Sequence, residues 1–380
     1  MNEKTKELLI AIRKEFHAHP EVSSQEYATQ QRILEFLKTH TKANFTEIAE
    51  TGILATFDGG NHGPTIMIRG DIDALPIQEI NTFAHHSKTE GISHKCGHDG
   101  HTAILLGLAL QLEKKPITRG KVLLLFQPAE ENGMGAQSVL EDSNFQKNKI
   151  DYVLALHNLP GIEKHEIVVK ENEFTANVKS IIIKLHGKTA HAAEPEFGHN
   201  PATATAEILQ YAEKHTHNQA DSPGFFLVTP VCVSLGEKAY GISAGYGELH
   251  LTIRSWSTDL MNKKCAALER FIEKKCEQHH LTPEVSWTQI FYANLNHPET
   301  VRIIKEAAKQ NKLKIIEAST PFKWGEDFGL FTQQFKGAMF GIGAGKNTPA
   351  LHNPDYDFPD DITPTGVAMF NTIINQILRT

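Results

Sequence analysis

Three apolar segments in the first half of the chain end in side chains that can bind a metal or move a proton. They are PTIMIRGDID, ending in Asp71 and Asp73, KVLLLFQPAEE, ending in Glu130 and Glu131, and DYVLALH, ending in His157. Short apolar runs of this kind predict buried strands, and carboxylates at the carboxyl end of a buried strand are typical of α/β active sites. The repetition predicts one shared site at one edge of a sheet.

A cysteine and two histidines follow one another closely between the first two of these segments, where Cys96–His101 reads CGHDGH. Cys96 and His98 are one residue apart, so in a turn both can face one ion. Thiolate, imidazole and carboxylate together favour zinc or a similar first-row metal, whereas calcium prefers oxygen ligands. A buried apolar cysteine beside surface histidines would explain any one of these residues, but not the whole set.

The segment that follows, TAILLGLALQLEKK, predicts a helix with Asp99 or Thr102 as its N-cap. The partial positive charge at the start of such a helix would help to hold the Cys96 thiolate.

Length and composition limit the class of protein. A chain of 380 residues is too long for one core and predicts two domains. A formal charge of -7 without a basic block argues against nucleic-acid binding. No run of about 18 apolar residues occurs, so no membrane span is expected, and the N-terminus predicts an amphipathic helix and not a signal peptide. The four cysteines form no close pair, which favours a reduced, cytoplasmic setting.

The pattern of elements changes near Ala176. Residues 176–292 read as β-α-β-β-α-β, the ferredoxin-like order, and place Cys232, Cys265 and Cys276 at apolar positions expected in a core. After this stretch a helix, a strand and a closing helix follow, with LHNPDYDF carrying His352 before the last helix. The sequence therefore predicts an α/β protein, in which a mixed-sheet metal-dependent catalytic domain of residues 1–175 and 293–380 holds an inserted α+β domain of residues 176–292.

Six blocks in order along nearly the whole chain resemble the M20 metallopeptidase superfamily. They are GDIDALPIQE, CGHDGHTAILLG, FQPAEE, GKTAHAAEP, WGEDF and LHNPDYDF. The chain looks most similar to the amidohydrolase branch, which includes hippurate hydrolases, N-acetyl-diaminopimelate deacetylase and the plant auxin-conjugate hydrolases. The resemblance implies hydrolysis of the amide bond of an N-acyl amino acid or small peptide at a two-metal centre. It also implies that the inserted domain is a lid through which two subunits pair.

Carried over to this chain, the resemblance implies five ligands for two divalent cations: Cys96, His98, Glu131, His157 and His352. Cys96 would bridge the two ions. Glu130 would be the general base, taking a proton from water whose pKa the metal lowers and delivering it to the leaving amine. Asp73 is expected to orient a ligand, while His101 and Asp99 are expected to support or cap the site without binding metal.

Two residues of the inserted domain complete the expected site. His191, in AHAAEP, corresponds to a family histidine that reaches a neighbouring subunit's site and polarises the scissile carbonyl, which implies a homodimer. Arg254 is a candidate for clamping the substrate carboxylate, the alternative being an ordinary exposed strand arginine. The segment GEKAYGISAGYGELH departs from the family's Asn-Val-Ile-Pro stretch, which helps to shape the substrate pocket. The acyl group and the amino acid therefore stay open.

The sequence thus predicts a metal-dependent amidohydrolase acting on a small N-acyl amino acid, most often N-acetyl. A dipeptidase or carboxypeptidase of the same superfamily, or a non-catalytic ligand-binding relative, are the alternatives. The ligand set accepts zinc, manganese, nickel or cobalt, and leaves the metal open.

Overall fold

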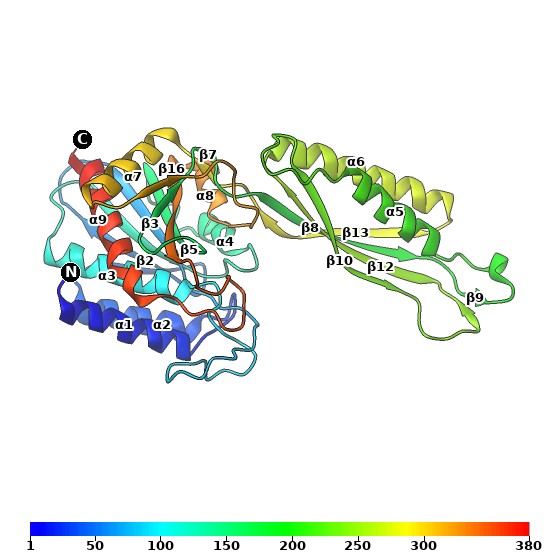
Figure 1. The fold of residues 1–380 in the computed structure, drawn as a ribbon, viewed down its shortest axis with the longest axis horizontal. Helices are drawn as coiled ribbons and strands as arrows, with labels where there is room; N and C mark the ends of the chain where they lie inside the picture. Colours follow the sequence, from blue (N-terminus) through cyan, green and yellow to red (C-terminus); the bar gives the residue numbers. More distant parts are fainter. Residues whose placement is uncertain (380) are drawn as a thin grey trace. The chain divides into compact units, whose positions relative to one another are not determined.

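The computed structural model describes residues 1–379, which form two compact units (Figure 1). The first unit contains Met1–Phe174, Asn294–Ser319 and the chain from Glu326 onward, and the second contains Thr175–Ala293 and Thr320–Gly325. Each unit has its own hydrophobic core.

An eight-stranded mixed sheet forms the centre of the first unit, with the order β1-β2-β4-β3-β5-β16-β6-β15. Its strands are β1 (Asn44–Ile48), β2 (Gly52–Asp58), β3 (Thr65–Asp71), β4 (Lys121–Gln127), β5 (Tyr152–Pro160), β6 (Ile167–Val169), β15 (Ile315–Glu317) and β16 (Gly337–Gly345). The three strands expected from the sequence, β3, β4 and β5, lie side by side and parallel. Their carboxyl ends therefore meet at one edge of the sheet, as predicted.

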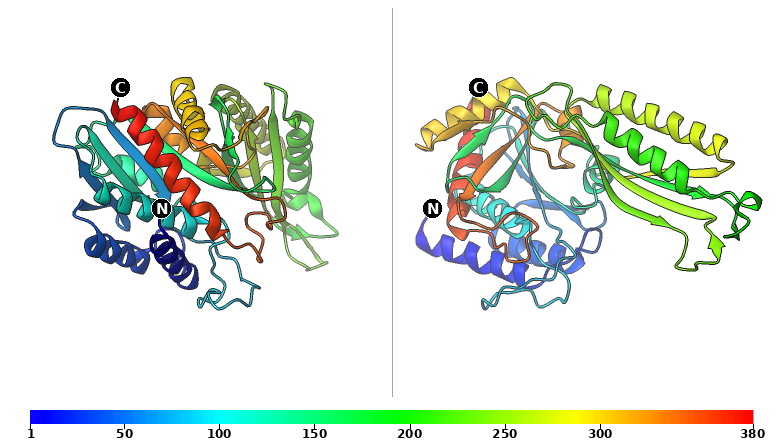
Figure 2. Two further views of the ribbon diagram at one scale, coloured as in Figure 1. Left: turned by 60° about the vertical axis from the view of Figure 1, so that its left-hand side comes forward. Right: turned by 45° about the vertical axis from the view of Figure 1, so that its right-hand side comes forward.

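The helices of the first unit are α1 (Glu3–Ala18), α2 (Tyr27–His40), α3 (His98–Lys114), α4 (Gly135–Glu141), α7 (Pro298–Gln310), α8 (Gly329–Gln334) and α9 (Thr363–Arg379). The helix α3 is apolar on almost every side and packs against α1 and α9 (Figure 2). A Cβ at Gly107 would come within 2.7 Å of Val367 and 2.8 Å of Leu9, so glycine permits this close approach. Within residues 1–379, no helix is both long and apolar enough to cross a membrane.

The start of α3 differs from the prediction. The helix begins at His98, and its N-cap is Gly97, which has a φ of 95° and no capping side chain. The prediction of Asp99 or Thr102 as N-cap was wrong because the helix starts earlier and places both residues inside it. The Asp99 carboxylate instead accepts hydrogen bonds from Arg13 and His17 of α1.

The second unit contains a four-stranded antiparallel sheet with the order β10-β12-β8-β13. Its main elements are β8 (Asn177–His186), α5 (Ala202–His215), β10 (Phe226–Leu235), β12 (Tyr246–Ser255), α6 (Thr258–Gln278) and β13 (Thr282–Phe291). Alternate residues of β8 and β12 are buried in a core shared with α5 and α6, which is the period expected of a sheet covered on one face.

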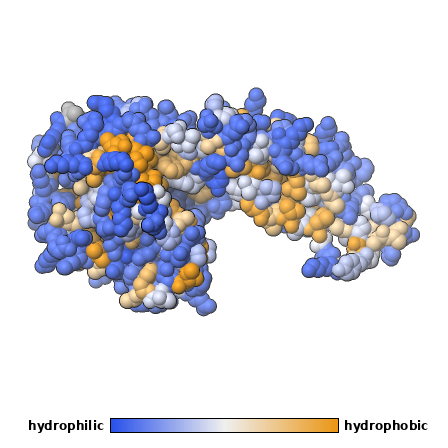
Figure 3. Space-filling model, in the orientation of Figure 1, coloured by the Kyte–Doolittle hydropathy of each residue, from blue (hydrophilic) through white to orange (hydrophobic). Residues whose placement is uncertain are grey.

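One edge of this sheet is unusually apolar. The second half of the edge strand β10 is exposed, including Val231 (60%), Val233 (45%) and Leu235 (41%), and Figure 3 shows hydrophobic surface over the strands of this unit. Cys232 lies in the same stretch and is exposed, so the prediction that it belongs to the core was wrong. Cys265 and Cys276 of α6 are buried, as predicted.

Candidate metal centre

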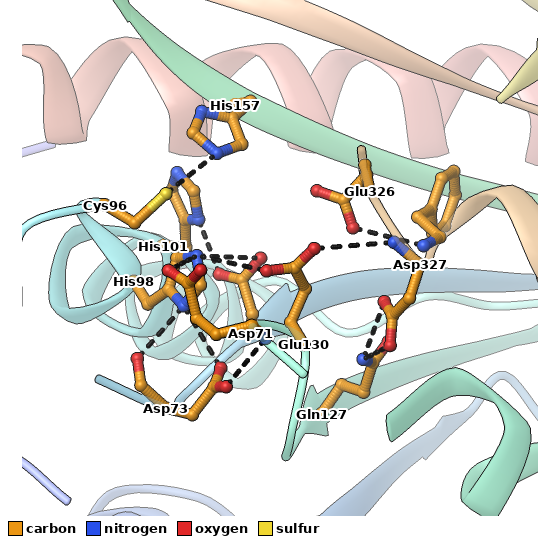
Figure 4. A network of polar contacts seen from close by, with 12 residues as sticks. Asp71, Asp73, Cys96, His98, His101, Gln127, Glu130, His157, Glu326 and Asp327 are labelled. Carbon is orange, nitrogen blue, oxygen red and sulfur yellow. Dashed lines mark hydrogen bonds and ion pairs between the residues drawn. The ribbon is translucent and has the colours of Figure 1, made fainter. Parts of the chain in front are cut away.

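Cys96 and His157 face each other across the carboxyl edge of the first unit's sheet (Figure 4). Cys96 is buried immediately before the start of α3, and its Sγ lies 3.6 Å from Nε2 of His157 on β5. Nδ1 of His157 donates a hydrogen bond to the Asn158 carbonyl at 2.9 Å. Burial lowers the pKa of His157 to about 3, which keeps its imidazole in the neutral form that metal binding requires.

His98 is the first residue of α3 and is held by Asp73. Its Nδ1 lies 3.0 Å from the Asp73 carbonyl oxygen and 3.1 Å from Oδ1 of the same residue. Because both partners only accept hydrogen bonds at neutral pH, Nδ1 carries a proton, and Nε2 is the atom left to bind a metal. Burial would lower the pKa of His98, but the charge of Asp71 and the other acidic neighbours raises it well above its ordinary value, so a bound cation would replace a proton at Nε2. Nε2 lies 3.8 Å from Oε1 of Glu131.

The atoms that face each other here have no hydrogen-bond partner. Nε2 of His98 and Oε1 of Glu131 are both buried, and within the part of the chain that the structure describes neither forms a hydrogen bond, although they lie within ion-pair distance of each other. Buried polar atoms are nearly always satisfied, so two facing atoms of the kinds that bind metals, neither with a hydrogen bond, indicate a place for a cation. The residues present therefore fit a metal ion.

His352 approaches from a loop that follows β16. Its Nε2 lies 3.8 Å from Oε2 of Glu131, and its backbone N–H donates to the carbonyl of Lys95 at 2.8 Å. The loop is thus joined to the segment that carries Cys96. His352 has a φ of 66°, in the left-handed region, and its side chain is 51% exposed.

The expected ligands form overlapping groups whose donor atoms lie within 4.8 Å of one another. Three of these groups are Cys96, His98 and His157; Cys96, Glu131 and His352; and His98, Glu130 and Glu131. The structure therefore brings the five sequence-predicted ligands and Glu130 into one cluster. Cys96 is shared by the group with His157 and the group with His352.

The cluster carries more acidic groups than its surroundings can neutralise. Burial raises the pKa of Glu131 to about 8, and raises the pKa of the Cys96 thiol. Burial, followed by the nearby charges of Glu326, Glu131 and Asp327, also raises the pKa of Glu130 well above its ordinary value. Acidic groups this crowded in a dry site must bind either protons or cations. Divalent cations would supply the missing positive charge.

Behind the cluster lies a layer of polar contacts, some of them made by residues that the sequence prediction did not single out. Asp71 Oδ1 lies 2.6 Å from Nδ1 of His101, and Nε2 of His101 lies 2.6 Å from Oδ1 of Asn158. His101 forms a further such group with Asp71 and His98, so the expectation that it supports the site without binding metal stays a prediction. Arg69, on β3, is fully buried and pairs with Asp71, Glu326 and Asp327. An arginine inside the apolar run TIMIRGD, and the acidic pair in WGEDF, were the signals that could have revealed this network.

The two remaining predicted residues belong to the second unit. His191 lies on the short strand β9 (Ala190–His191), which pairs with β11 (Ile242–Ser243), and its side chain is exposed. Its Nδ1 accepts a hydrogen bond from the Ala193 N–H at 3.1 Å. Arg254, near the end of β12, donates from Nη1 to the carbonyl of Lys323 at 2.6 Å, which uses one of the five N–H donors of a guanidinium.

The family model for peptidase family M20/M25/M40 matches residues 67–376. The chain belongs to this family. An N-acetyl-L-cysteine deacetylase of Bacillus subtilis (strain 168) is 32% identical over 336 residues, covering 88% of this chain and 80% of the relative. An N-acetyldiaminopimelate deacetylase of Bacillus velezensis is 29% identical over 374 residues, covering 97% of this chain and all of the relative (100%).

A solved M20 structure has the same fold over the whole chain. It is a Bacillus subtilis protein described as a dinuclear metal binding peptidase from the M20 family, with a TM-score of 0.84, 27% identity and coverage of 100% of both chains. This likeness confirms the expected mixed α/β fold. Together with the overlapping ligand groups, it also supports a centre that holds two divalent metals.

Proposed function

We propose that this M20 protein is a metal-dependent amidohydrolase that cleaves the amide bond of a small N-acyl amino acid, with N-acetyl as the acyl group. The observation that carries the proposal is the position of Glu130. Its Oε2 lies 3.9 Å from Nε2 of His98, beside the ligand cluster and next to Glu131. A carboxylate at the edge of a metal centre is placed to move protons between water and a leaving group. The deacetylases among the relatives support the substrate class.

In the proposed reaction, the chain's own residues bind the metal ions and transfer the proton. Cys96, His98, Glu131, His157 and His352 would hold two divalent cations. When bound, these cations would polarise the acyl carbonyl and increase the acidity of the attacking water. Glu130 takes a proton from that water and delivers it to the nitrogen of the leaving amine. Burial, and then the neighbouring carboxylates, raise the pKa of Glu130 in the metal-free centre, and bound cations would lower it again toward the range in which a carboxylate can both take and give a proton.

The second unit is proposed to act as the lid and dimerisation domain, residues 176–292, inserted into the catalytic domain of residues 1–175 and 293–380. An exposed edge strand with unpaired backbone groups and apolar side chains is a template for pairing with another chain, and β10 has both features. We propose that two copies pair through this edge. His191 would then reach the partner's site and polarise the scissile carbonyl, while Arg254 would bind the substrate carboxylate.

The metal and the compartment complete the proposal. A set of thiolate, imidazole and carboxylate ligands favours zinc, manganese, nickel or cobalt over calcium. All four cysteines are free thiols, which supports a reduced, cytoplasmic setting.

The test is release of free amine from a panel of N-acetyl and N-benzoyl amino acids, with manganese or zinc added. Glu130→Gln should lose turnover by about 10³-fold or more while it still binds metal, whereas Glu171→Gln, an exposed control, should behave as the wild type. Turnover confined to dipeptides would replace the proposal with a peptidase. If neither the N-acyl amino acids nor the dipeptides are hydrolysed although metal is bound, the proposal is overturned in favour of a non-catalytic binder.

A further inference from the structure

Asp327 joins the two ends of the turn that carries Glu130 and Glu131. Its two carboxylate oxygens accept hydrogen bonds from Nε2 of Gln127, at 2.9 and 2.8 Å, at the end of β4 (Figure 4). Oδ2 also accepts from the backbone N–H of Ala136, in the first turn of α4, at 2.8 Å. One fully buried side chain therefore contacts the residue before the turn and the helix after it.

The turn itself has a backbone that needs such support. Ala129 has a φ of 56°, in the left-handed region that a residue with a Cβ seldom adopts. Gly135 donates its N–H to the Ala129 carbonyl at 2.9 Å, and a Cβ at Gly135 would lie only 1.8 Å from the Pro128 carbonyl oxygen. Strained, closely packed backbone of this kind persists only where surrounding contacts hold it, and such backbone concentrates at functional sites.

Arg69 fixes Asp327 in turn. Its Nη2 donates to Oδ1 of Asp327 at 2.8 Å and to Glu326 at 2.9 Å, while its Nε donates to Gln127 at 2.8 Å. The same guanidinium contacts both residues of the Gln127–Asp327 pair, so the three side chains form a closed triangle. Buried ion pairs of this kind add little net stability, and a known use for them is to impose one geometry.

Asp327 also reaches the proposed base directly. Its backbone N–H points to Oε1 of Glu130 at 3.4 Å, a long hydrogen bond that leaves the carboxylate able to move. On the other side of the turn, the N–H of Glu131 donates to Oδ2 of Asp73 at 2.9 Å. Asp73 thus contacts Glu131, the candidate ligand, and Asp327 contacts Glu130, the proposed base.

We propose that Asp327, supported by Arg69, is a positioning residue that sets Glu130 and Glu131 in their relation to one another. The inference rests on the proposed function, because it assigns Asp327 a role in presenting the general base. Asp327 belongs to the acidic pair of WGEDF and is neither a candidate metal ligand nor the proposed base. The positioning role would account for its presence beside the site.

The experiment compares Asp327→Asn with Asp142→Asn. Asp142 is the matched control, since its carboxylate also accepts backbone N–H bonds, from Ala49 and Asn144, but at the far end of α4. For Asp327→Asn, kcat should fall about 100-fold with KM nearly unchanged, because a small misplacement of a catalytic group has an effect of this size. Its metal affinity, measured by calorimetry, should fall about 10-fold through the displaced Glu131. The control should change neither quantity.

A variant that merely unfolds would not reproduce this pattern, so each protein is assayed well below its own melting temperature. If Asp327→Asn does not fold, Gln127→Met removes one side of the triangle at similar volume and should show the same loss of kcat. Wild-type kcat together with wild-type metal affinity in a folded Asp327 variant overturns the inference. If the wild type itself hydrolyses nothing in the panel, the proposed function fails, and the calorimetric comparison still decides the role of Asp327.

Discussion

Asp73 contacts two of the candidate metal ligands with different atoms. Its carbonyl and Oδ1 accept the hydrogen bond from Nδ1 of His98, at 3.0 and 3.1 Å, while Oδ2 accepts the N–H of Glu131 at 2.9 Å. A third bond, from the Ser23 hydroxyl at 2.7 Å, holds the carboxylate in place. Asp73 therefore holds one candidate ligand from each of two segments that are remote in sequence.

Replacing Asp73 with Asn should weaken metal binding by about 10- to 100-fold, the usual effect of removing a residue that orients a ligand. The amide presents an NH₂ group to either His98 or Glu131, where each needs an acceptor. Competition with a chromogenic chelator measures the affinity. Asp58→Asn, which alters an exposed pair with Lys121, should leave it unchanged. Equal affinities for wild type and Asp73→Asn would contradict the orienting role.

The ligand groups predict unequal effects on metal content. If Cys96 bridges the two ions, as the family resemblance implies, Cys96→Ala should reduce occupancy of both, whereas His157→Ala and His352→Ala, which share a group with Cys96 but not with each other, should each reduce mainly one. Elemental analysis after dialysis against a fixed free metal concentration gives the number of ions per chain. The exposed thiol variant Cys232→Ser should keep the wild-type number. Retention of two ions by Cys96→Ala would rule out a bridging sulfur.

A buried histidine behind the site should make stability depend on pH. Burial would lower the pKa of His17, but hydrogen bonds to Asp99 and Glu79, at 2.8 and 3.1 Å, raise it to about 9. Since the folded-state pKa lies above the unfolded value of 6.5, the stabilisation is complete below about pH 6.5 and is lost as pH rises through about 9.

The advantage of the metal-free wild type over His17→Asn in free energy of unfolding should therefore shrink by about 3 kcal/mol between pH 6 and pH 10. Urea unfolding of both proteins at several pH values measures this difference, and groups that titrate equally in both cancel. A difference that stays constant with pH would show that His17 is not charged in the folded protein.

The proposed pairing through β10 should be sensitive to charge on its exposed apolar face. The valine side chain at position 233 is 45% exposed, and Val233→Lys places an ammonium group there. This substitution should convert dimer to monomer at micromolar concentration. Ile80→Lys, at an exposed apolar residue of the first unit (63%), is the control and should leave the association state unchanged. Sedimentation velocity distinguishes the two states. A Val233→Lys protein that sediments as the wild type does would place any interface elsewhere.

Local pattern predicted the central strands and the helices on either side of them, because the hydrophobic period and the turn residues are local properties. The same pattern placed the start of α3 too late, since Gly97 begins the helix through its left-handed φ without a capping side chain. Cys232 looked like a core residue because its neighbours are apolar, yet β10 is an edge strand and that stretch is exposed. Which strand lies at an edge is a property of the whole sheet.

The residues behind the site were harder to predict. Arg69 and Arg13 are fully buried although arginine is normally exposed, and each is neutralised by carboxylates far away in the sequence. Arg69 pairs with Glu326, and Arg13 pairs with Asp360. Such pairings depend on how the chain returns to the first unit after residue 293. The spacing of apolar residues in a single sequence does not predict which distant carboxylates will meet these arginines.

The position of β16 has a consequence for how the protein is made. This strand lies between β5 and β6, yet residues 337–345 leave the ribosome after the whole of the second unit. Until then β5, which carries His157, keeps an open edge, and nascent chains with open edges are prone to aggregate. His352 emerges later still. The candidate metal ligands are therefore all present only late in synthesis, after β16 has filled its place in the middle of the sheet.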